Sequence, residues 1–152
     1  MKKVKSNLQE IKLSYHTPKA SYKAESITTS LEAFSYLTEF YPKNEIGMQE
    51  RFVILYLNRN NRPIGAAPMF KGGVSATIID NKLIFATALK SLASGIILSH
   101  NHPSGSSKPS EEDRRVTQKI KDGCRLLEIT LIDHLILTPD GNYLSFADEG
   151  II

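Results

Sequence analysis

Apolar residues recur along this chain in two periods, and each period predicts one kind of secondary structure. Spacings of three and four residues predict three helices, from Leu31 to about Phe40, from about Asn81 to Ala93 and from Ser110 to about Asp122. Gly123 follows the third helix, where glycine favours a helix end. The residues expected to face the core share the helical spacing: Leu31, Phe34, Leu37 and Phe40, then Phe85, Ala88, Leu89 and Leu92, then Val116, Ile120 and Leu126 or Leu127.

Shorter runs rich in β-branched and aromatic residues predict strands. These runs are residues 50–57, 64–70, 95–98, 129–137 and 143–146, and a further apolar run covers 74–79. Stretches rich in Asn, Gly and Pro separate them as turns. The alternation predicts an α/β fold, with helices packed on a mixed sheet in one domain, residues 27–152. Residues 1–26 show no clear period and are expected to form an arm or an added edge strand.

Composition places the chain among ordinary globular proteins, with 41% hydrophobic and 23% charged residues. No segment is long and apolar enough to cross a membrane, and no apolar run follows the basic N-terminus as in a signal peptide. Cys124 is the single cysteine, which fits a reducing compartment, so we expect a cytoplasmic protein without a membrane partner. The net charge of +3 permits contact with nucleic acid without arguing for it.

Candidate chemistry is concentrated where the buried strand 95–98 ends. His100 and His102 continue the alternation of that strand and would project to one side of the sheet. Pro and Gly residues then force a loop, and Ser110 opens the next helix with Asp113 in its first turn. Two histidines and an aspartate that converge would form a three-ligand site with an open fourth position, as in catalytic zinc sites. Alternatively, Ser110 and Asp113 form only a helix cap, and the histidines are ordinary hydrogen-bonded residues.

The pattern His100-x-His102, seven residues, Ser110, two residues, Asp113 resembles the core of the JAMM (JAB/MPN-type) metalloprotease motif. The longer run His-Asn-His-Pro-Ser-Gly, with Asp133-His134-Leu135-Ile136 downstream, resembles the RadC-like JAB proteins of bacteria. The resemblance extends from about Glu50 to the end of the chain. It implies the α/β/α layering of the cytidine-deaminase-like JAB/MPN fold.

The same resemblance implies roles for individual residues. It makes His100, His102 and Asp113 the ligands of Zn2+, and Glu50 the general acid/base that moves the proton of a zinc-activated water. Glu45 is a weaker competitor for that proton-transfer role. Ser110 is implied to stabilise the oxyanion of the substrate, in addition to or instead of capping the helix.

Two further features stay open at this point. Asp133 and His134 lie in an apolar strand, and buried ionisable groups need partners. They are expected either to orient a ligand histidine or to form a self-contained pair that orders the strand. Asn101 stands where JAMM deubiquitinating enzymes carry Ser or Thr, which argues against cleavage of ubiquitin. A cytidine deaminase is excluded because that chemistry needs a Cys-x-x-Cys pair.

The sequence therefore predicts a zinc-dependent hydrolase, a metallopeptidase or isopeptidase that acts on a peptide or protein substrate. One alternative is a DNA-repair-associated accessory protein, as the RadC name suggests. Longer relatives carry a DNA-binding helix-hairpin-helix region, which residues 1–49 do not resemble, so a short form with weak DNA binding is expected. The other alternative is a metal-binding module without turnover, for which five intact site residues would be superfluous.

Overall fold

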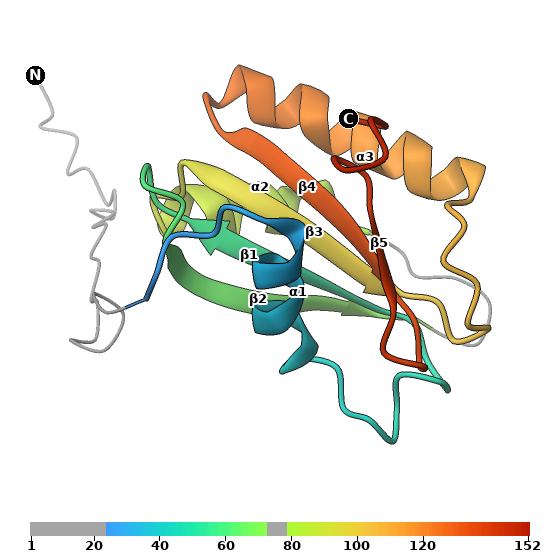
Figure 1. Cartoon of the computed structure of the whole chain (residues 1–152). Coiled ribbons are helices and arrows are strands. Elements are labelled where there is room, and N and C mark those ends of the chain that lie inside the picture. The colour runs from blue at the N-terminus through green and yellow to red at the C-terminus, as the bar shows by residue number, and fades with distance from the viewer. Residues whose placement is uncertain (1–23, 73–78) are drawn as a thin grey trace, which may run out of the picture.

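The computed structural model describes residues 24–72 and 79–152 of the 152-residue chain. The described strands form one mixed sheet in the order β2-β1-β3-β4-β5 (Figure 1). Only the pair β3 and β4 is parallel, and the other neighbours are antiparallel. The strands are β1 Arg51–Leu57, β2 Pro63–Lys71, β3 Gly95–Asn101, β4 Thr130–Leu137 and β5 Tyr143–Ser145.

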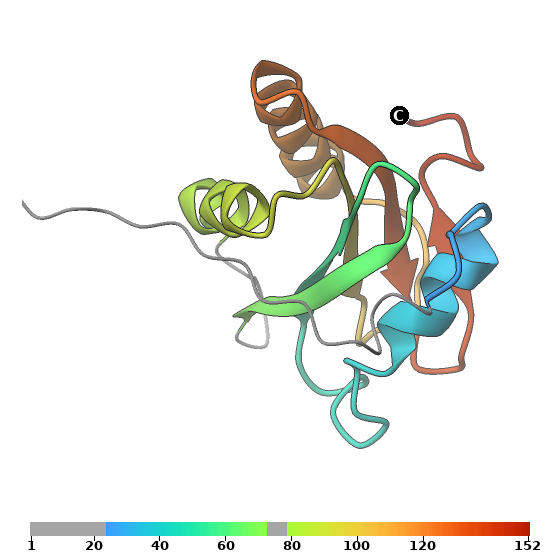
Figure 2. The same cartoon turned by 90° about the vertical axis from the view of Figure 1, so that its left-hand side faces the viewer.

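Helices cover both faces of this sheet, as Figure 2 shows. One face packs against α1, and the opposite face packs against α2 and α3. The described helices are α1 Ser30–Thr38, α2 Asn81–Lys90 and α3 Glu111–Leu126. This is the single-domain α/β/α arrangement predicted from the sequence. No helix in the described ranges has the length and apolarity that a membrane crossing requires.

Strand β3 lies at the centre of the sheet and is buried along its whole length. Its side chains alternate between two cores, with Ile96 and Leu98 toward α2 and α3 and Ile97 toward α1. A strand buried on both faces needs apolar residues at consecutive positions, which the run Gly95-Ile-Ile-Leu supplies. The helical connection α3 joins β3 to the parallel strand β4, because parallel neighbours need a long crossover.

The structure confirms the three predicted helices and corrects their ends and faces. Helix α3 continues to Leu126 rather than ending near Asp122, so Gly123 lies inside it. The core positions of α3 are Thr117, Ile120 and Cys124, whereas Leu126 is 86% exposed and Leu127 lies at the surface. The spacing of three and four residues was right, but its register was misplaced at the C-terminal end.

Helices α1 and α2 show the same kind of correction. Helix α1 ends at Thr38, and Leu31 is exposed while Ala33 and Leu37 are buried. Helix α2 ends at Lys90 and buries Ile84 and Ala88. The predicted core residues Leu89 and Leu92 are exposed, because an α-helix with positions 84 and 88 inward turns position 89 outward, and Leu92 lies beyond its end.

The strand predictions are confirmed, with boundaries that shift by a few residues. Strand β3 extends three residues past Leu98, and β5 ends at Ser145 rather than Phe146. Of the apolar run 74–79, only Ile79 lies within the described residues. The arm predicted for residues 1–26 falls mostly outside them as well, since the description begins at residue 24.

The contact between α2 and α3 depends on the missing side chain of Gly123. A Cβ added there would lie 2.3 Å from Cζ of Phe85, far inside van der Waals contact. We expect Gly123→Ala to lower the free energy of unfolding by about 1–3 kcal/mol, because overpacking outweighs the better helix propensity of alanine. Denaturant unfolding measures the difference.

Two further variants test the cause. Gly65→Ala meets no atom within 4 Å and should be nearly neutral. In a Phe85→Ala background, Gly123→Ala should become stabilising, because the obstructing ring is gone. A Gly123→Ala protein as stable as the native chain would contradict this account of the helix contact.

Candidate metal centre

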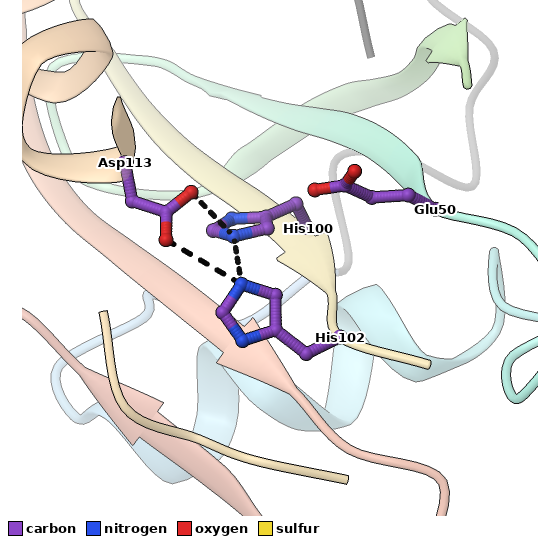
Figure 3. A group of neighbouring side chains, drawn as sticks. All are labelled: Glu50, His100, His102 and Asp113. Atoms are coloured by element: carbon purple, nitrogen blue, oxygen red, sulfur yellow. Dashed lines mark hydrogen bonds and ion pairs between the residues drawn. The ribbon is translucent and has the colours of Figure 1, made fainter. Parts of the chain in front are cut away.

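Three elements meet at one end of the central strand and bring the predicted site residues together. His100 lies in β3, His102 follows its last residue, and Asp113 lies in the first turn of α3. Glu50 immediately precedes β1, whose antiparallel pairing places Phe52 opposite His100. Figure 3 shows the four side chains converging, with Glu50 approaching from the side away from Asp113. Each offers one ligand atom, and these atoms all lie within 4.8 Å of one another.

The separations of the donor atoms fit a tetrahedral ion. Nε2 of His100 lies 3.0 Å from Nε2 of His102 and 3.0 Å from Oδ1 of Asp113. Nε2 of His102 lies 3.4 Å from Oδ2 of Asp113. Metal–ligand bonds of 2.0–2.1 Å in a tetrahedron would place the donors about 3.3 Å apart, so these three residues fit zinc with little rearrangement.

Asp113 is held by the start of its own helix. Ser110 is the N-cap of α3, and its hydroxyl accepts a hydrogen bond from the Asp113 amide at 3.1 Å. Oδ2 of Asp113 accepts in return from the Ser110 amide and hydroxyl, both at 2.7 Å. The capping box anticipated from Ser110-x-x-Asp113 is therefore present, and it leaves Oδ1 directed at His100.

Electrostatics keep the Asp113 carboxylate ionised. Burial opposes its charge, but hydrogen bonds from His100, His102 and Ser110 outweigh burial and hold its pKa well below the usual range. The hydrogen bond to Asp113 raises the pKa of His102 against the opposing effect of burial, and the carbonyl of Ser106 adds to the rise. Nδ1 of His102 donates to that carbonyl at 2.7 Å, because a carbonyl only accepts, so Nε2 is the nitrogen left for the centre.

The side chains of Asp133 and His134, adjacent in sequence, have different partners. The Asp133 carboxylate turns away from the site and accepts from the Ser145 hydroxyl at 2.6 Å and the Ala147 amide at 3.0 Å. His134 projects toward the site, and its Nε2 lies 2.8 Å from Nδ1 of His100. The first alternative therefore holds for His134, which contacts the candidate ligand His100, whereas Asp133 ties β4 to the segment after it.

The two candidate bases also have different surroundings. Glu45 is bound by Arg51 and by Lys71, and these cations lower the pKa of its carboxyl. Glu45 is not part of the cluster around His100. Glu50 belongs to that cluster and is partly buried at its edge. Geometry therefore favours Glu50 over Glu45 as the carboxylate that reaches the centre.

Asn101, between the two histidines, holds the segment that carries Glu50. Its side chain points to the opposite face from the histidines and is fully buried. Nδ2 donates to the carbonyls of Ile46 at 2.6 Å and Gln49 at 2.9 Å, and Oδ1 accepts from the Arg51 amide at 2.7 Å. The neighbours of Glu50 on both sides are thus hydrogen-bonded to the strand that carries the histidines.

The cluster opens into a pocket of about 850 Å³. The lining includes the four residues of the cluster and Ser110. Three cationic side chains, Lys108, Arg115 and Lys119, border it, with Glu112 bound to Arg115 at 3.1 Å. The volume is in the range of small-molecule and cofactor sites.

Comparison with known proteins agrees with this geometry. Residues 27–151 match the family model described as RadC-like JAB domain. The chain belongs to this family. The JAB/MPN superfamily, to which RadC-like domains belong, includes metalloisopeptidases, and the five-stranded mixed sheet with its helices is consistent with the JAB/MPN fold.

Curated relatives that are similar to this RadC-like domain carry the name UPF0758 protein. The Flavobacterium johnsoniae relative is 41% identical over 129 residues, 85% of this chain and 55% of the relative. The Porphyromonas gingivalis relative is 44% identical over 128 residues, 84% of this chain and 55% of the relative. The Methanosarcina mazei relative is 38% identical over 115 residues, 76% and 50% of the two chains. The chain spans about half the length of these relatives.

Two residues of the RadC-like site were not anticipated from the sequence. Thr117 hydrogen-bonds His134 from one turn beyond Asp113, and Asn101 holds the Glu50 segment. The signal for Thr117 was a polar residue at a helix position that faces the core, three residues before Ile120 and seven before Cys124. For Asn101, the signal was an amide within a strand buried on both faces.

Asn101→Asp tests the hold on the Glu50 segment. A carboxylate cannot donate to the carbonyls of Ile46 and Gln49, so two acceptors would face a buried anion. We expect the free energy of unfolding to fall by about 2–4 kcal/mol, as measured by denaturant titration.

Asn58→Asp is the matched control. Oδ1 of Asn58 accepts from the amides of Asn60 and Arg62, and its Nδ2 has no role in either bond, so a carboxylate preserves both. Its stability should stay within about 0.5 kcal/mol of the native value. Equal losses in the two variants would show that charge alone, rather than the lost donors, determines the effect.

Proposed function

We propose that this protein is a zinc-dependent hydrolase that cleaves an amide bond in a peptide or protein. The observation that carries the proposal is the cluster of Glu50, His100, His102 and Asp113 at the base of a pocket. Three nitrogen and oxygen ligands with a nearby unligated carboxylate are the usual plan of a hydrolytic zinc site. Membership of the RadC-like JAB family supports the same reading.

His100, His102 and Asp113 would hold the ion, and Glu50 would stay outside that set. Zinc bound there would supply a Lewis acid that makes a water nucleophilic near neutral pH. Glu50 would accept the proton of that water and return it to the leaving amine, because its partly buried carboxylate lies in the cluster and outside the ligand set. Its carboxylate lies on the side of the cluster away from Asp113 (Figure 3).

Ser110 would donate a hydrogen bond to the oxyanion that forms on the substrate carbonyl. Its hydroxyl proton points at Oδ2 of Asp113 in the structure, and Ser110 lines the pocket. Rotation about one side-chain bond redirects that proton to the pocket. The hydrogen bond from the Ser110 backbone amide to the Asp113 carboxylate then still caps the helix. The capping and catalytic roles are therefore compatible.

DNA processing is the second candidate, and one observation favours it. Lys108, Arg115 and Lys119 border the pocket and would attract a phosphate backbone. Glu112 offsets Arg115. A site for one candidate ion, with Asp113 as its carboxylate ligand and Glu50 beside it, suits attack on a carbonyl better than phosphodiester cleavage, which commonly uses two metals. Binding to DNA is therefore expected to be weak and lost at moderate salt.

The zinc proposal predicts about one zinc per chain in protein purified without chelator. His102→Ala should lose most of that zinc, because two ligands remain where three are needed. Elemental analysis measures the content. His16→Ala is the control, since His16 lies outside the match to the family model and should keep its zinc. Full zinc content in His102→Ala would exclude His102 as a ligand.

The catalytic proposal predicts that Glu50→Gln keeps zinc and folding but loses turnover by at least about a hundredfold, the usual scale for a general base. Cleavage of peptide libraries, and of single- and double-stranded DNA at several salt concentrations, gives the rates. Glu45→Gln should retain peptide cleavage, because Glu45 is bound to cations outside the cluster. Nuclease activity that Glu50→Gln abolishes, without peptide cleavage, would overturn the proposal in favour of DNA processing.

A further inference from the structure

A chain of hydrogen bonds runs behind the candidate ligands, from α3 to His100. The Thr117 hydroxyl lies 2.6 Å from the carbonyl oxygen of Asp113 and 2.6 Å from Nδ1 of His134. Nε2 of His134 lies 2.8 Å from Nδ1 of His100. All three residues are buried, with exposures of 1% for Thr117 and His134 and 2% for His100. Water therefore has little access to any of these bonds.

The direction of each bond follows from counting protons. A backbone carbonyl only accepts, so the single hydroxyl proton of Thr117 belongs to the bond with Asp113. The Thr117 oxygen must then accept from His134, which places a proton on Nδ1 of His134. A buried neutral imidazole protonated on Nδ1 has its lone pair on Nε2, so His134 accepts from Nδ1–H of His100.

We infer that Thr117 is a positioning residue that, through His134, keeps the proton of His100 on Nδ1 and reserves Nε2 for the metal. The inference rests on the metal site proposed above. Ligand histidines usually donate this second proton to a carboxylate or a carbonyl, which can only accept. A histidine in that place can accept or donate, according to its tautomer. His134 therefore accepts from His100 only when the proton of His134 is held on its other nitrogen, Nδ1. Thr117 supplies that constraint.

The arrangement joins two functions in one helix. Asp113 directs its carboxylate at the centre. Its backbone carbonyl accepts a hydrogen bond from the hydroxyl of Thr117, which lies one turn further along α3. When α3 packs against β4, Asp113 is placed at the centre and Thr117 is placed against His134, so the same packing sets the tautomer of His100. This use of a buried threonine explains a polar residue at a core position between Asp113 and Ile120.

Thr117→Val tests the inference, because it keeps the shape and removes the hydroxyl. In metal-free native protein, long-range ¹H–¹⁵N correlation spectra should place the His134 proton on Nδ1; the chain has only four histidines to assign. In Thr117→Val, the Nε2-protonated tautomer of His134 should become populated. Zinc affinity should fall by about 10- to 100-fold, the usual effect of losing such a partner.

Two variants separate the effect of this hydrogen-bond chain from that of general packing. Thr117→Ser keeps a hydroxyl and should restore both the tautomer and the zinc affinity. Thr138→Val removes another buried hydroxyl, one bonded to Asp140 and to the Asn142 carbonyl in the turn after β4, and should change neither.

A native His134 protonated on Nε2 would overturn the inference, as would native zinc affinity in folded Thr117→Val. Failure of the native chain to bind zinc would instead contradict the proposed metal site. The tautomer measurement on metal-free protein needs no variant and no zinc. It therefore decides the direction of the hydrogen bonds whether or not the native chain binds zinc.

Discussion

The pairing of β3 with its two neighbours is the constraint on which the rest of the site depends. Antiparallel pairing with β1 places Phe52 opposite His100 and brings Glu50 to the end of the strand that carries both histidines. Parallel pairing with β4 requires the crossover helix α3, whose first turn then returns Asp113 to the same end. One buried strand thereby gathers four side chains that are up to 63 residues apart in sequence.

Each polar group near the centre is oriented by a partner on a neighbouring element. Asp113 is held by Ser110, His102 by the Ser106 carbonyl, and His100 by His134. Asn101 holds the backbone on both sides of Glu50 from the opposite face of the same strand. Such partners position reactive groups without occupying the pocket, which leaves its space for substrate.

Much of this could be predicted from the sequence. Apolar periodicity predicted the helices and strands, and alternation placed Ile96, Leu98 and His100 on one face. Leu92 and Leu127 lie beyond the ends of α2 and α3, whereas the errors at Leu89 and Leu126 concern the phase of the helix. Periodicity gives a spacing but not a phase, and the phase was decided by partners distant in sequence, such as Phe85 against Gly123.

The sequence by itself determined the local chemistry: a strand ending in His-x-His, a capping Ser110 and an aspartate in the first helical turn. These follow from interactions within a few residues, for which spacing is sufficient information. Only the tertiary structure decided that Glu50 rather than Glu45 reaches the cluster, that Asp133 and His134 serve different faces, and that Thr117 contacts His134. Those facts depend on which strands pair and how α3 docks, and hydrogen-bond partners across elements have no fixed spacing in the sequence.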